Sequence, residues 1–232
     1  MFLGHYGVAL ALKRAEPKLS LGTLFVAVQL PDLLWGIFLL LGWERARIVP
    51  GHTAITPLEF LHYPISHSLL GALAWSFVAA ALYYSWPTRD TSRHWQAAAM
   101  VGLAAFSHYP LDVLVHIPDL PLSGSGSVKL GLGLWNNPVA TLIAEAVVFG
   151  GGLAIYISRP SNRHPVRLPR LVIVVVLLVG TYAASLLGPV PASMTVVAVS
   201  DIVFLLVIAA LAAWADRRAS RHELDARGLS HR

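Results

Sequence analysis

The sequence predicts an all-α, polytopic transmembrane helical bundle of six long spans preceded by a short N-terminal helix. Of the 232 residues, 56% are hydrophobic and 12% are charged, and the mean hydropathy is +0.65. A soluble globular domain carries about 25% charged residues, so this composition favours a membrane protein. Each apolar run is roughly 17–23 residues long, enough to cross a hydrocarbon core of about 30 Å as a helix. The six runs are residues 20–41, 66–86, 95–116, 138–157, 171–187 and 194–214.

The N-terminal stretch, residues 1–12, is apolar but short, and it ends at Lys13 and Arg14. It lacks the basic start and small-residue cleavage site of a signal peptide, so we expect it to stay in the mature chain. We expect one integral-membrane domain over residues 1–214 and a charged cytoplasmic tail over residues 215–232. Because the chain has no cysteine, disulfides and thiolate metal sites are excluded, and His, Asp and Glu remain as candidate ligands.

The basic residues follow the expected topology. With six spans, all but three of the 17 Lys and Arg residues lie on one side, the exceptions being Arg45, Arg47 and Lys129. The positive-inside rule makes the basic side, with the C-terminus, cytoplasmic. The net charge of +5 then reflects topology, and no nucleic-acid partner is expected. Tryptophans near the expected span ends suit the membrane interface; they are Trp43, Trp86, Trp95, Trp135 and Trp214.

A polar stripe occurs where the third apolar run ends. His108, Asp112 and His116 are spaced by four residues, which places them within roughly an 80° arc of one helix face. Two imidazoles and a carboxylate are a plausible set of metal ligands, and polar groups inside a span are costly unless they have a function. The alternative is a helix kinked at Pro110 whose polar groups bond to neighbouring spans.

Asp32 lies inside the first apolar run, directly after Pro31. A carboxylate near the bilayer centre costs about 2.5–3.5 kcal/mol, so we expect Asp32 to face the bundle interior as a metal ligand or catalytic base. Pro31 removes a backbone hydrogen bond, and the freed carbonyl could line a cavity. The alternative is a single buried acid hydrogen-bonded to a neighbouring span.

Two more histidines, His62 and His67, precede the second long run. With Pro64 between them they do not share a regular helical face, but they converge if His62 lies on the entry turn. Ser66 is a candidate N-cap. The alternative is an interfacial histidine and a helix cap without any ligand role.

Glu145 in the fourth run is a candidate ligand, general base or partner that orients a histidine. His5 joins the set if residues 1–12 cross as a short helix. Depth along each expected helix then brings His, Asp or Glu from five separate segments to one level in the outer half of the membrane. The sequence therefore predicts a site assembled from several spans.

At these residues the chain resembles the family of membrane-bound metal-dependent hydrolases described as LexA-binding, inner-membrane-associated hydrolases. The matching motifs occur in the family's order within roughly residues 1–135; they are Gly4-His5, Leu30-Pro31-Asp32, His62 followed by Ser66-His67-Ser68-Leu69, and Ser107-His108 with Asp112. The resemblance implies a metal-dependent hydrolase of a prokaryotic inner membrane. Two departures are Leu33-Leu34-Trp35, where the family carries a second acid and a histidine, and Tyr63, where it carries Arg.

We therefore expect a divalent metal cofactor, zinc for this set of imidazoles and carboxylates, bound by His67, His108 and Asp112 and completed by Asp32 or His5. Asp32 or Glu145 would accept a proton from water during hydrolysis of a small-molecule or lipid-linked phosphoester substrate among the membrane lipids. One alternative is a proton- or metal-coupled transporter or channel, although the sequence has no repeat and no matched pair of broken helices. Another is a non-catalytic scaffold. The sequence does not predict the oligomeric state.

Overall fold

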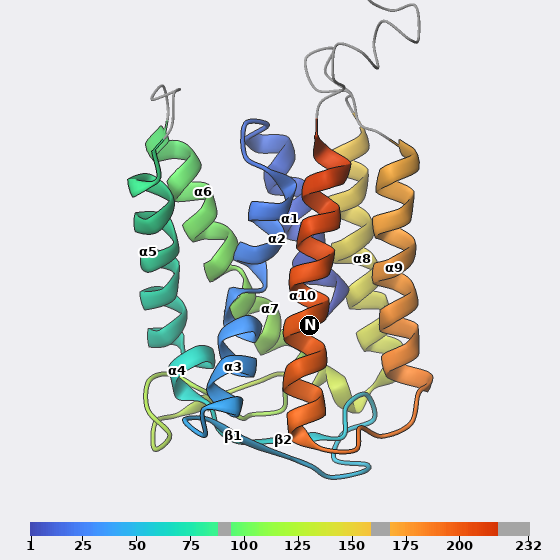
Figure 1. Ribbon diagram of the computed structural model, residues 1–232. Coiled ribbons are helices and arrows are strands. Elements are labelled where there is room, and N and C mark those ends of the chain that lie inside the picture. Colours follow the sequence, from blue (N-terminus) through green and yellow to red (C-terminus); the bar gives the residue numbers. More distant parts are fainter. Residues whose placement is uncertain (88–93, 159–167, 218–232) are drawn as a thin grey trace, which may run out of the picture.

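The computed structural model describes residues 1–87, 94–158 and 168–217, which form a helical bundle with short strands at one end (Figure 1). The helices are α1 (Leu3–Ala15), α2 (Leu21–Val28), α3 (Leu30–Leu40), α4 (Pro64–His67), α5 (Leu69–Ser85), α6 (His94–Phe106), α7 (His108–Val115), α8 (Pro138–Ile157), α9 (Leu168–Leu187) and α10 (Met194–Asp216). The strands are β1 (Arg45–Ile48), β2 (Leu58–His62), β3 (Leu120–Pro121) and β4 (Lys129–Leu130), and a 3-10 helix, η1, covers Leu134–Asn136. We call the end that carries β1 and β2 the hairpin end, and the end where α10 terminates the tail end.

Four helical segments of the described chain are long and apolar enough to cross a membrane: α6 with α7 (His94–Val115), α8, α9 and α10. Together α2 and α3 pass the same test but are bent by 56°, and they make a fifth span if the bent pair counts as one. The 17 residues of α5 form a shorter apolar helix. The described chain is mostly helical, as predicted, but two short strand pairs correct the all-α class; its apolar helices could cross a membrane, and the predicted number of six long spans is supported only as far as four or five. Most of the predicted tail, residues 218–232, lies outside the described residues.

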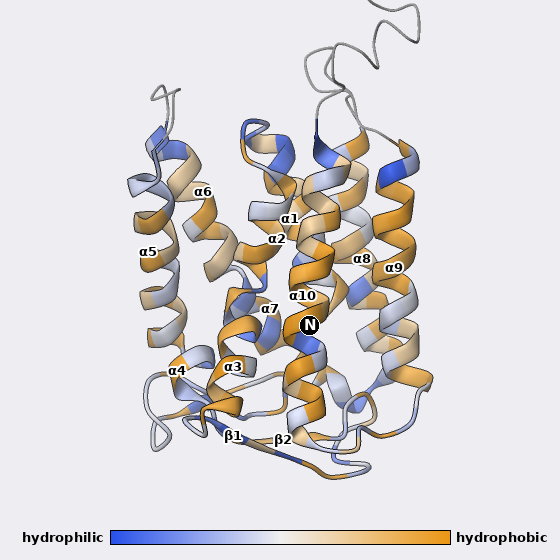
Figure 2. Ribbon diagram, viewed as in Figure 1, coloured by the Kyte–Doolittle hydropathy of each residue, from blue (hydrophilic) through white to orange (hydrophobic). Residues whose placement is uncertain are grey.

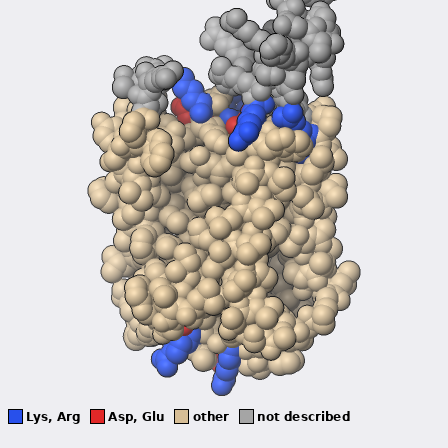
Figure 3. All heavy atoms as spheres, in the orientation of Figure 1, with Lys and Arg blue, Asp and Glu red and all other residues tan. Residues whose placement is uncertain are grey.

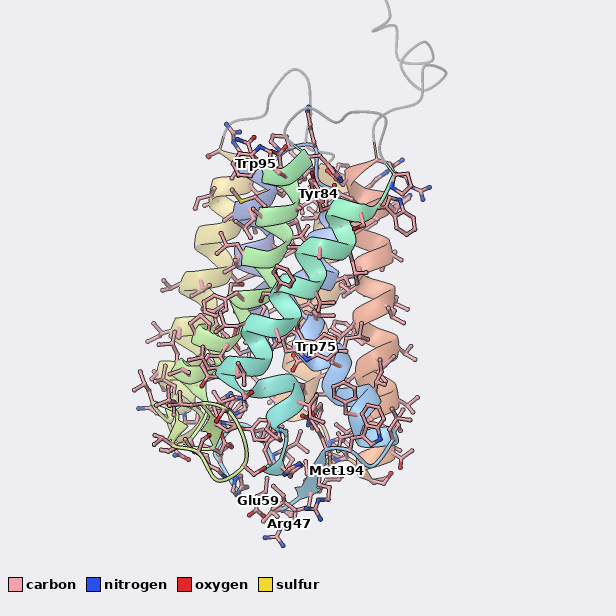
Figure 4. All side chains as sticks on the ribbon, turned by 90° about the vertical axis from the view of Figure 1, so that its left-hand side faces the viewer. Arg47, Glu59, Trp75, Tyr84, Trp95 and Met194 are labelled. Carbon is pink, nitrogen blue, oxygen red and sulfur yellow. The ribbon has the colours of Figure 1, made fainter. Side chains whose placement is uncertain are left out.

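The sides of the bundle are apolar. Ribbon segments of α9 and α10 are coloured hydrophobic over most of their length, while hydrophilic residues gather at the bundle ends and inside, on α7 (Figure 2). On the face in Figure 3, Lys, Arg, Asp and Glu are confined to the two ends. Trp95 and Tyr84 lie at the tail end in Figure 4, as aromatic residues at a membrane interface should. Large exposed side chains such as Phe77 and Leu82 on α5 suit contact with lipid.

The predicted short N-terminal helix is present as α1, and it lies inside the bundle, packed against α2 and α8 (Figure 1). His5 and Tyr6 in this helix are both 0% exposed. The approach to α8 is close because both helices carry glycine at the contact: a Cβ at Gly152 would lie 1.9 Å from the carbonyl oxygen of Gly7. These two glycines allow α1 to bring His5 to the bundle axis.

A buried ion pair fixes the tail end of α1. Lys13 Nζ donates to the carbonyl oxygens of Pro17 (2.9 Å) and Leu19 (2.6 Å) and to Asp216 Oδ2 (2.7 Å). The backbone N–H of Leu21 donates to the same carboxylate oxygen at 3.0 Å. The turn from α1 to α2 is thus tied to the last residue of α10, and the Lys13 charge is paired rather than left buried alone.

The bend between α2 and α3 occurs at Gln29, two residues before Pro31. Proline lacks the N–H that would bond to the fourth preceding carbonyl, so it is accommodated in the first turn of a new helix. The carbonyl of Val28 leaves the helical hydrogen-bond ladder and accepts from His108 Nδ1 at 2.8 Å. The break therefore places both Asp32, in the first turn of α3, and a free carbonyl toward the interior.

The third predicted span is interrupted at Ser107, where α6 ends and α7 begins. Pro110, in the first turn of α7, lacks a backbone donor and favours this interruption. His116 is the C-cap of α7, and its N–H bonds to the Asp112 carbonyl. The helical spacing of His108 and Asp112 is kept, while His116 already lies at the helix end.

The hairpin end is closed by the antiparallel pair β1–β2, the short pair β3–β4, α4 and η1. Beneath these segments Trp35, Tyr63 and Leu120 are 5%, 2% and 0% exposed. Figure 4 shows Arg47 and Glu59 at the tip of the hairpin, where Arg47 Nε donates to Glu59 Oε2 at 2.5 Å. Polar side chains inside the bundle are thus covered by an apolar layer at this end.

The contact between α1 and α8 can be tested with two substitutions in one helix. A Cβ at Gly152 meets the backbone of α1, whereas a Cβ at Gly150 meets nothing within 4 Å. We expect Gly152→Ala to lower the free energy of unfolding by about 1–3 kcal/mol, because α1 must move away. Gly150→Ala should leave it unchanged or raise it, since alanine favours helix. Equal unfolding midpoints of both variants in detergent would contradict this packing.

Candidate metal centre

Histidine and aspartate side chains from α1, α3, α4 and α7 meet inside the bundle near the hairpin end. Two overlapping groups each bring three ligand atoms within 4.8 Å of one another: His5, Asp32 and His108, and His67, His108 and Asp112. The three histidines and Asp112 are at most 5% exposed. We call these five residues the polar centre.

Asp112 is the hub of the polar centre. Its Oδ2 atom lies 2.9 Å from His108 Nε2 and 3.8 Å from His67 Nε2. Its Oδ1 atom lies 3.1 Å from His5 Nε2. His116 approaches from the hairpin side, with Nε2 3.8 Å from Asp112 Oδ2. One carboxylate thus faces an Nε2 atom of each of four imidazoles.

Asp32 faces the same imidazoles from α3. Its Oδ1 atom lies 3.2 Å from His67 Nε2 and 3.5 Å from His108 Nε2. The Asp32 side chain is 28% exposed, compared with 3% for Asp112, so it is the most accessible carboxylate of the centre. Its place in the first turn of α3 is favourable for a negative charge, because unpaired N–H groups and the helix dipole point toward it.

The orientation of His108 is set by a backbone carbonyl. Its Nδ1 atom lies 2.8 Å from the carbonyl oxygen of Val28. A carbonyl oxygen only accepts hydrogen bonds, so Nδ1 carries the proton and donates. In the neutral ring the Nε2 atom then presents a lone pair toward Asp112 and Asp32.

His67 is held in the same tautomer through a serine. The Ser66 hydroxyl donates to Glu44 Oε2 at 2.5 Å, so its oxygen accepts from His67 Nδ1 at 2.7 Å. Glu44 is 1% exposed and also accepts the backbone N–H groups of Ile65 and Ser66, each at 2.8 Å. The lone pair of His67 Nε2 is therefore directed toward the carboxylates of the centre.

His116 repeats the arrangement with a second carboxylate. Its Nδ1 atom lies 3.0 Å from Asp119 Oδ1, and a carboxylate accepts, so Nε2 again is the unprotonated nitrogen of the neutral ring. The ring packs against Trp135, with centroids 4.0 Å apart, and against Phe60 at 5.2 Å. Hydrogen-bonded Nδ1 atoms that fix ring orientation are typical of histidines that bind metal through Nε2.

In these tautomers the unprotonated Nε2 atoms lie opposite carboxylate oxygens, so that two hydrogen-bond acceptors face each other. His108 Nε2 lies 2.9 Å from Asp112 Oδ2 but, among the described residues, it has no hydrogen-bond partner of acceptable geometry. Two acceptors at this separation repel unless a proton or a metal ion lies between them. In a tetrahedral site with metal–ligand distances of about 2.0–2.2 Å, ligand atoms lie about 3.3–3.6 Å apart. The separations of 2.9–3.8 Å around Asp112 and Asp32 span that value.

Glu145 contacts the backbone of the first helix. Its carboxylate accepts the N–H groups of Phe2 at 2.6 Å and Gly4 at 2.7 Å, two donors that the first turn of a helix leaves unpaired. The amino group of Met1 donates to Asp112 Oδ1. The described contacts of Glu145 thus hold α1, and with it His5, against α8.

The sequence proposed seven metal ligands, and the structure brings together His5, Asp32, His67, His108 and Asp112, with His116 at the edge. His62 lies apart from them. Its Nδ1 atom is 2.6 Å from the hydroxyl of Ser125, in the exposed loop between β3 and β4. The entry turn therefore does not bring His62 and His67 to the same place.

The sequence analysis missed two carboxylates, Glu44 behind Ser66 and Asp119 behind His116, and the contact of the Val28 carbonyl with His108. Glu44 follows Trp43 at the expected end of a span, where an acid is usually solvated. Asp119 is three residues after His116, and this spacing is its only local signal. The break before Pro31 was predicted to free a carbonyl, but the hydrogen bond that this carbonyl accepts from His108 Nδ1 depends on packing.

Comparison with protein-family models, with curated proteins and with solved structures finds no match to this chain. The chemical interpretation of the polar centre therefore depends on its geometry.

The serine that orients His67 provides a test. Removing a hydrogen-bond partner of a histidine ligand costs about 10–100-fold in metal affinity. If the centre binds a divalent ion, we expect Ser66→Ala to weaken that binding, measured by competition of added metal with a chromogenic chelator, by that factor. Ser76→Ala is the matched control, because this buried hydroxyl donates to the Ala72 carbonyl of its own helix and, among the described residues, contacts no member of the polar centre. Equal affinities of the two variants would show that Ser66 does not act on a ligand.

Proposed function

We propose that this protein is an integral-membrane, metal-dependent hydrolase. Its ligands for a divalent ion, zinc in this proposal, are His67, His108 and Asp112, completed by Asp32 or His5. The supporting observation is the pair of buried imidazoles whose Nδ1 protons are held by Ser66 and by a carbonyl, and whose Nε2 lone pairs face two carboxylates. A set of imidazole and carboxylate ligands without thiolate suits zinc.

A bound divalent ion would supply a Lewis acid that lowers the pKa of a water molecule toward neutrality. The chain's own residues would accept the proton, position the ligands and exclude water. Asp32, the most accessible carboxylate, accepts a proton from the attacking water. Glu145 holds the start of α1, and with it His5, in place against α8. The apolar layer at the hairpin end, with Tyr63 at 2% exposure, limits bulk water.

We propose a lipid-linked or phosphoester substrate, because the polar centre lies within a bundle whose sides are apolar. In this proposal α5 is the sixth span: its 17 residues measure about 26 Å at 1.5 Å per residue. The tail end, where Lys13, Arg14 and Arg217 lie, would face the cytoplasm of a prokaryotic cell by the positive-inside rule. The order of the four motifs supports membership of the inner-membrane hydrolase family.

A proton- or metal-coupled transporter or channel is the second candidate, favoured by one observation. The α2–α3 segment is broken by 56° beside the polar centre, and α6–α7 is interrupted at Ser107 opposite it. Broken helices that meet at a buried ion site are typical of secondary transporters.

Metal content tests the site directly. We expect protein purified without chelator to carry about one divalent ion per chain, and His108→Ala and Asp112→Ala to lose it, because each removes one of the three ligands proposed to hold it. His52→Ala, a histidine of the hairpin end outside the polar centre, should keep the ion. Elemental analysis of folded, monodisperse samples measures the metal content of the wild type and of each variant. A wild-type protein free of metal, with unchanged thermal stability in chelator, would instead support a scaffold whose polar groups lock helices together.

Turnover and transport can be separated in proteoliposomes. We expect metal-dependent hydrolysis of a phosphoester lipid, abolished by chelator and restored by zinc. Asp32→Asn should lower kcat by about 10²–10⁴-fold, the usual contribution of a general base. Ion uptake that depends on a gradient, without any product of hydrolysis, would establish the transporter instead.

A further inference from the structure

A further carboxyl group, that of Asp201, lies inside α10. Among the long apolar segments of the described chain, α10 contains the most apolar stretch, with a mean hydropathy of 2.7, and Asp201 is its one acid before Asp216 at the end. A carboxyl group at this depth is costly, and acids in such segments usually face the bundle interior and have a function there. Asp201 is not one of the five residues of the polar centre.

Helix packing places Asp201 beside Asp32. Helices α3 and α10 lie side by side (Figure 1), and at their contact a Cβ on Gly36 would lie 2.9 Å from Ile202 Cγ1 and 3.4 Å from the carbonyl oxygen of Ala198. Asp32 lies one turn before Gly36 on the same face of α3, and Asp201 directly precedes Ile202. Asp32 is eight residues from the hairpin-side end of α3, and Asp201 is seven from that of α10, so both lie about 10–12 Å along their helices from that end.

Electrostatic interactions agree with this position. The carboxyl group of Asp201 interacts with the charges of Asp32 and His108. The hydroxyl of Tyr6 on α1, a side chain that is 0% exposed, lies within electrostatic reach of both acids and next to Gln29. Polar groups from α1, α3 and α10 thus share one region beside the polar centre.

The two acids have different surroundings. Asp32 lies in the first turn of α3, where unpaired N–H groups stabilise a negative charge, and its Oδ1 atom faces the Nε2 atoms of His67 and His108. Asp201 lies beyond the first turn of α10, and among the described residues its side chain makes no hydrogen bond or ion pair. An isolated charge is expensive in an apolar interior, and more so beside a second negative charge, so Asp201 is most stable as the neutral acid.

Both carboxyl groups are accessible to a substrate. Asp32 is 28% exposed and Asp201 is partly exposed, whereas the histidines of the polar centre and Asp112 are at most 5% exposed. Two carboxyl groups of one site whose environments favour different protonation states are the usual arrangement of a general acid and a general base.

We propose that Asp201 is the general acid of this site and donates its carboxyl proton to the leaving oxygen of the substrate. The inference rests on the proposed function, to which it adds a second catalytic residue. In the hydrolytic step the oxygen of a water molecule forms a bond to phosphorus, and its proton passes to Asp32. The bond from phosphorus to the leaving oxygen breaks, the electron pair stays on that oxygen, and the proton of Asp201 neutralises it. Transfer of a proton from Asp32 to Asp201 then restores both groups.

This role of Asp201 narrows the substrate class. An aliphatic alcohol leaves as a strongly basic alkoxide and needs a proton, whereas a phosphate or a nitrophenolate leaves as a stable anion. A general acid on α10 is therefore suited to the phosphoester of an aliphatic lipid alcohol rather than to a diphosphate.

Two phosphoesters that differ in the leaving group test the role of Asp201. The full chain in proteoliposomes is assayed with didodecyl phosphate and with dodecyl para-nitrophenyl phosphate. We expect Asp201→Asn to lower kcat about 10²–10⁴-fold for the alkyl ester, the usual contribution of a general acid, and at most about threefold for the nitrophenyl ester. Asp201→Glu, which keeps a carboxyl proton, should retain part of the activity on the alkyl ester. The control is Ser200→Ala, which removes a hydroxyl that donates to the Val196 carbonyl of the same helix at 2.7 Å and should leave both rates unchanged.

Infrared spectroscopy gives a measurement that needs no substrate. A protonated carboxyl group has a carbonyl stretching band separate from the bands of carboxylates, and the wild type at neutral pH should show one that is missing in Asp201→Asn. The metal content of the two proteins should be equal, because Asp201 is not among the proposed ligands.

A selective loss on the alkyl ester together with the infrared band supports the inference. Equal losses on both esters, an unchanged rate on the alkyl ester, loss of bound metal in Asp201→Asn, or absence of the band would overturn it and leave the hydrolase in place. If the wild type hydrolyses neither ester, the proposed hydrolase is rejected, and the role of Asp201 with it.

Discussion

The polar centre depends on hydrogen bonds that fix which nitrogen of His67 and His108, and of the neighbouring His116, carries the proton. Three acceptors from different segments, the Val28 carbonyl, the Ser66 hydroxyl and the Asp119 carboxylate, each accept a hydrogen bond from the Nδ1–H of one histidine. The Nε2 atoms are then turned toward Asp112. Inside a membrane bundle water cannot replace a missing partner, so this arrangement restricts how α2, α4 and α7 pack.

Interrupted helices make that arrangement possible. A continuous helix through residues 21–40 would keep the Val28 carbonyl in its own hydrogen-bond ladder, out of reach of His108. The break before Pro31 frees the carbonyl and at the same time starts a new helix whose first turn carries Asp32. Irregular backbone at membrane depth is tolerated only where it is buried or lines a cavity, and here its polar atoms are used by the centre.

The hairpin end has a different chemistry from the centre beneath it. The centre presents lone pairs and carboxylates, a set of groups that could hold a cation, whereas the hairpin end presents the ammonium group of Lys129 and the hydroxyls of Tyr63 and Ser125 beside Asp119. Tyr63 packs against His67 and Asp119 contacts His116, so these two residues lie between the centre and the hairpin end.

The sequence by itself determined the membrane class, the short N-terminal helix and most residues of the centre, because hydropathy and helical spacing are local properties. The four-residue spacing of His108 and Asp112, for example, predicted their shared face. Only the tertiary structure decided the bend at Gln29, the brevity of α5 and the separation of His62 from His67. It alone revealed Glu44 and Asp119 as the partners that orient His67 and His116. Hydrogen bonds between segments distant in the chain depend on how helices pack, and no local pattern encodes them.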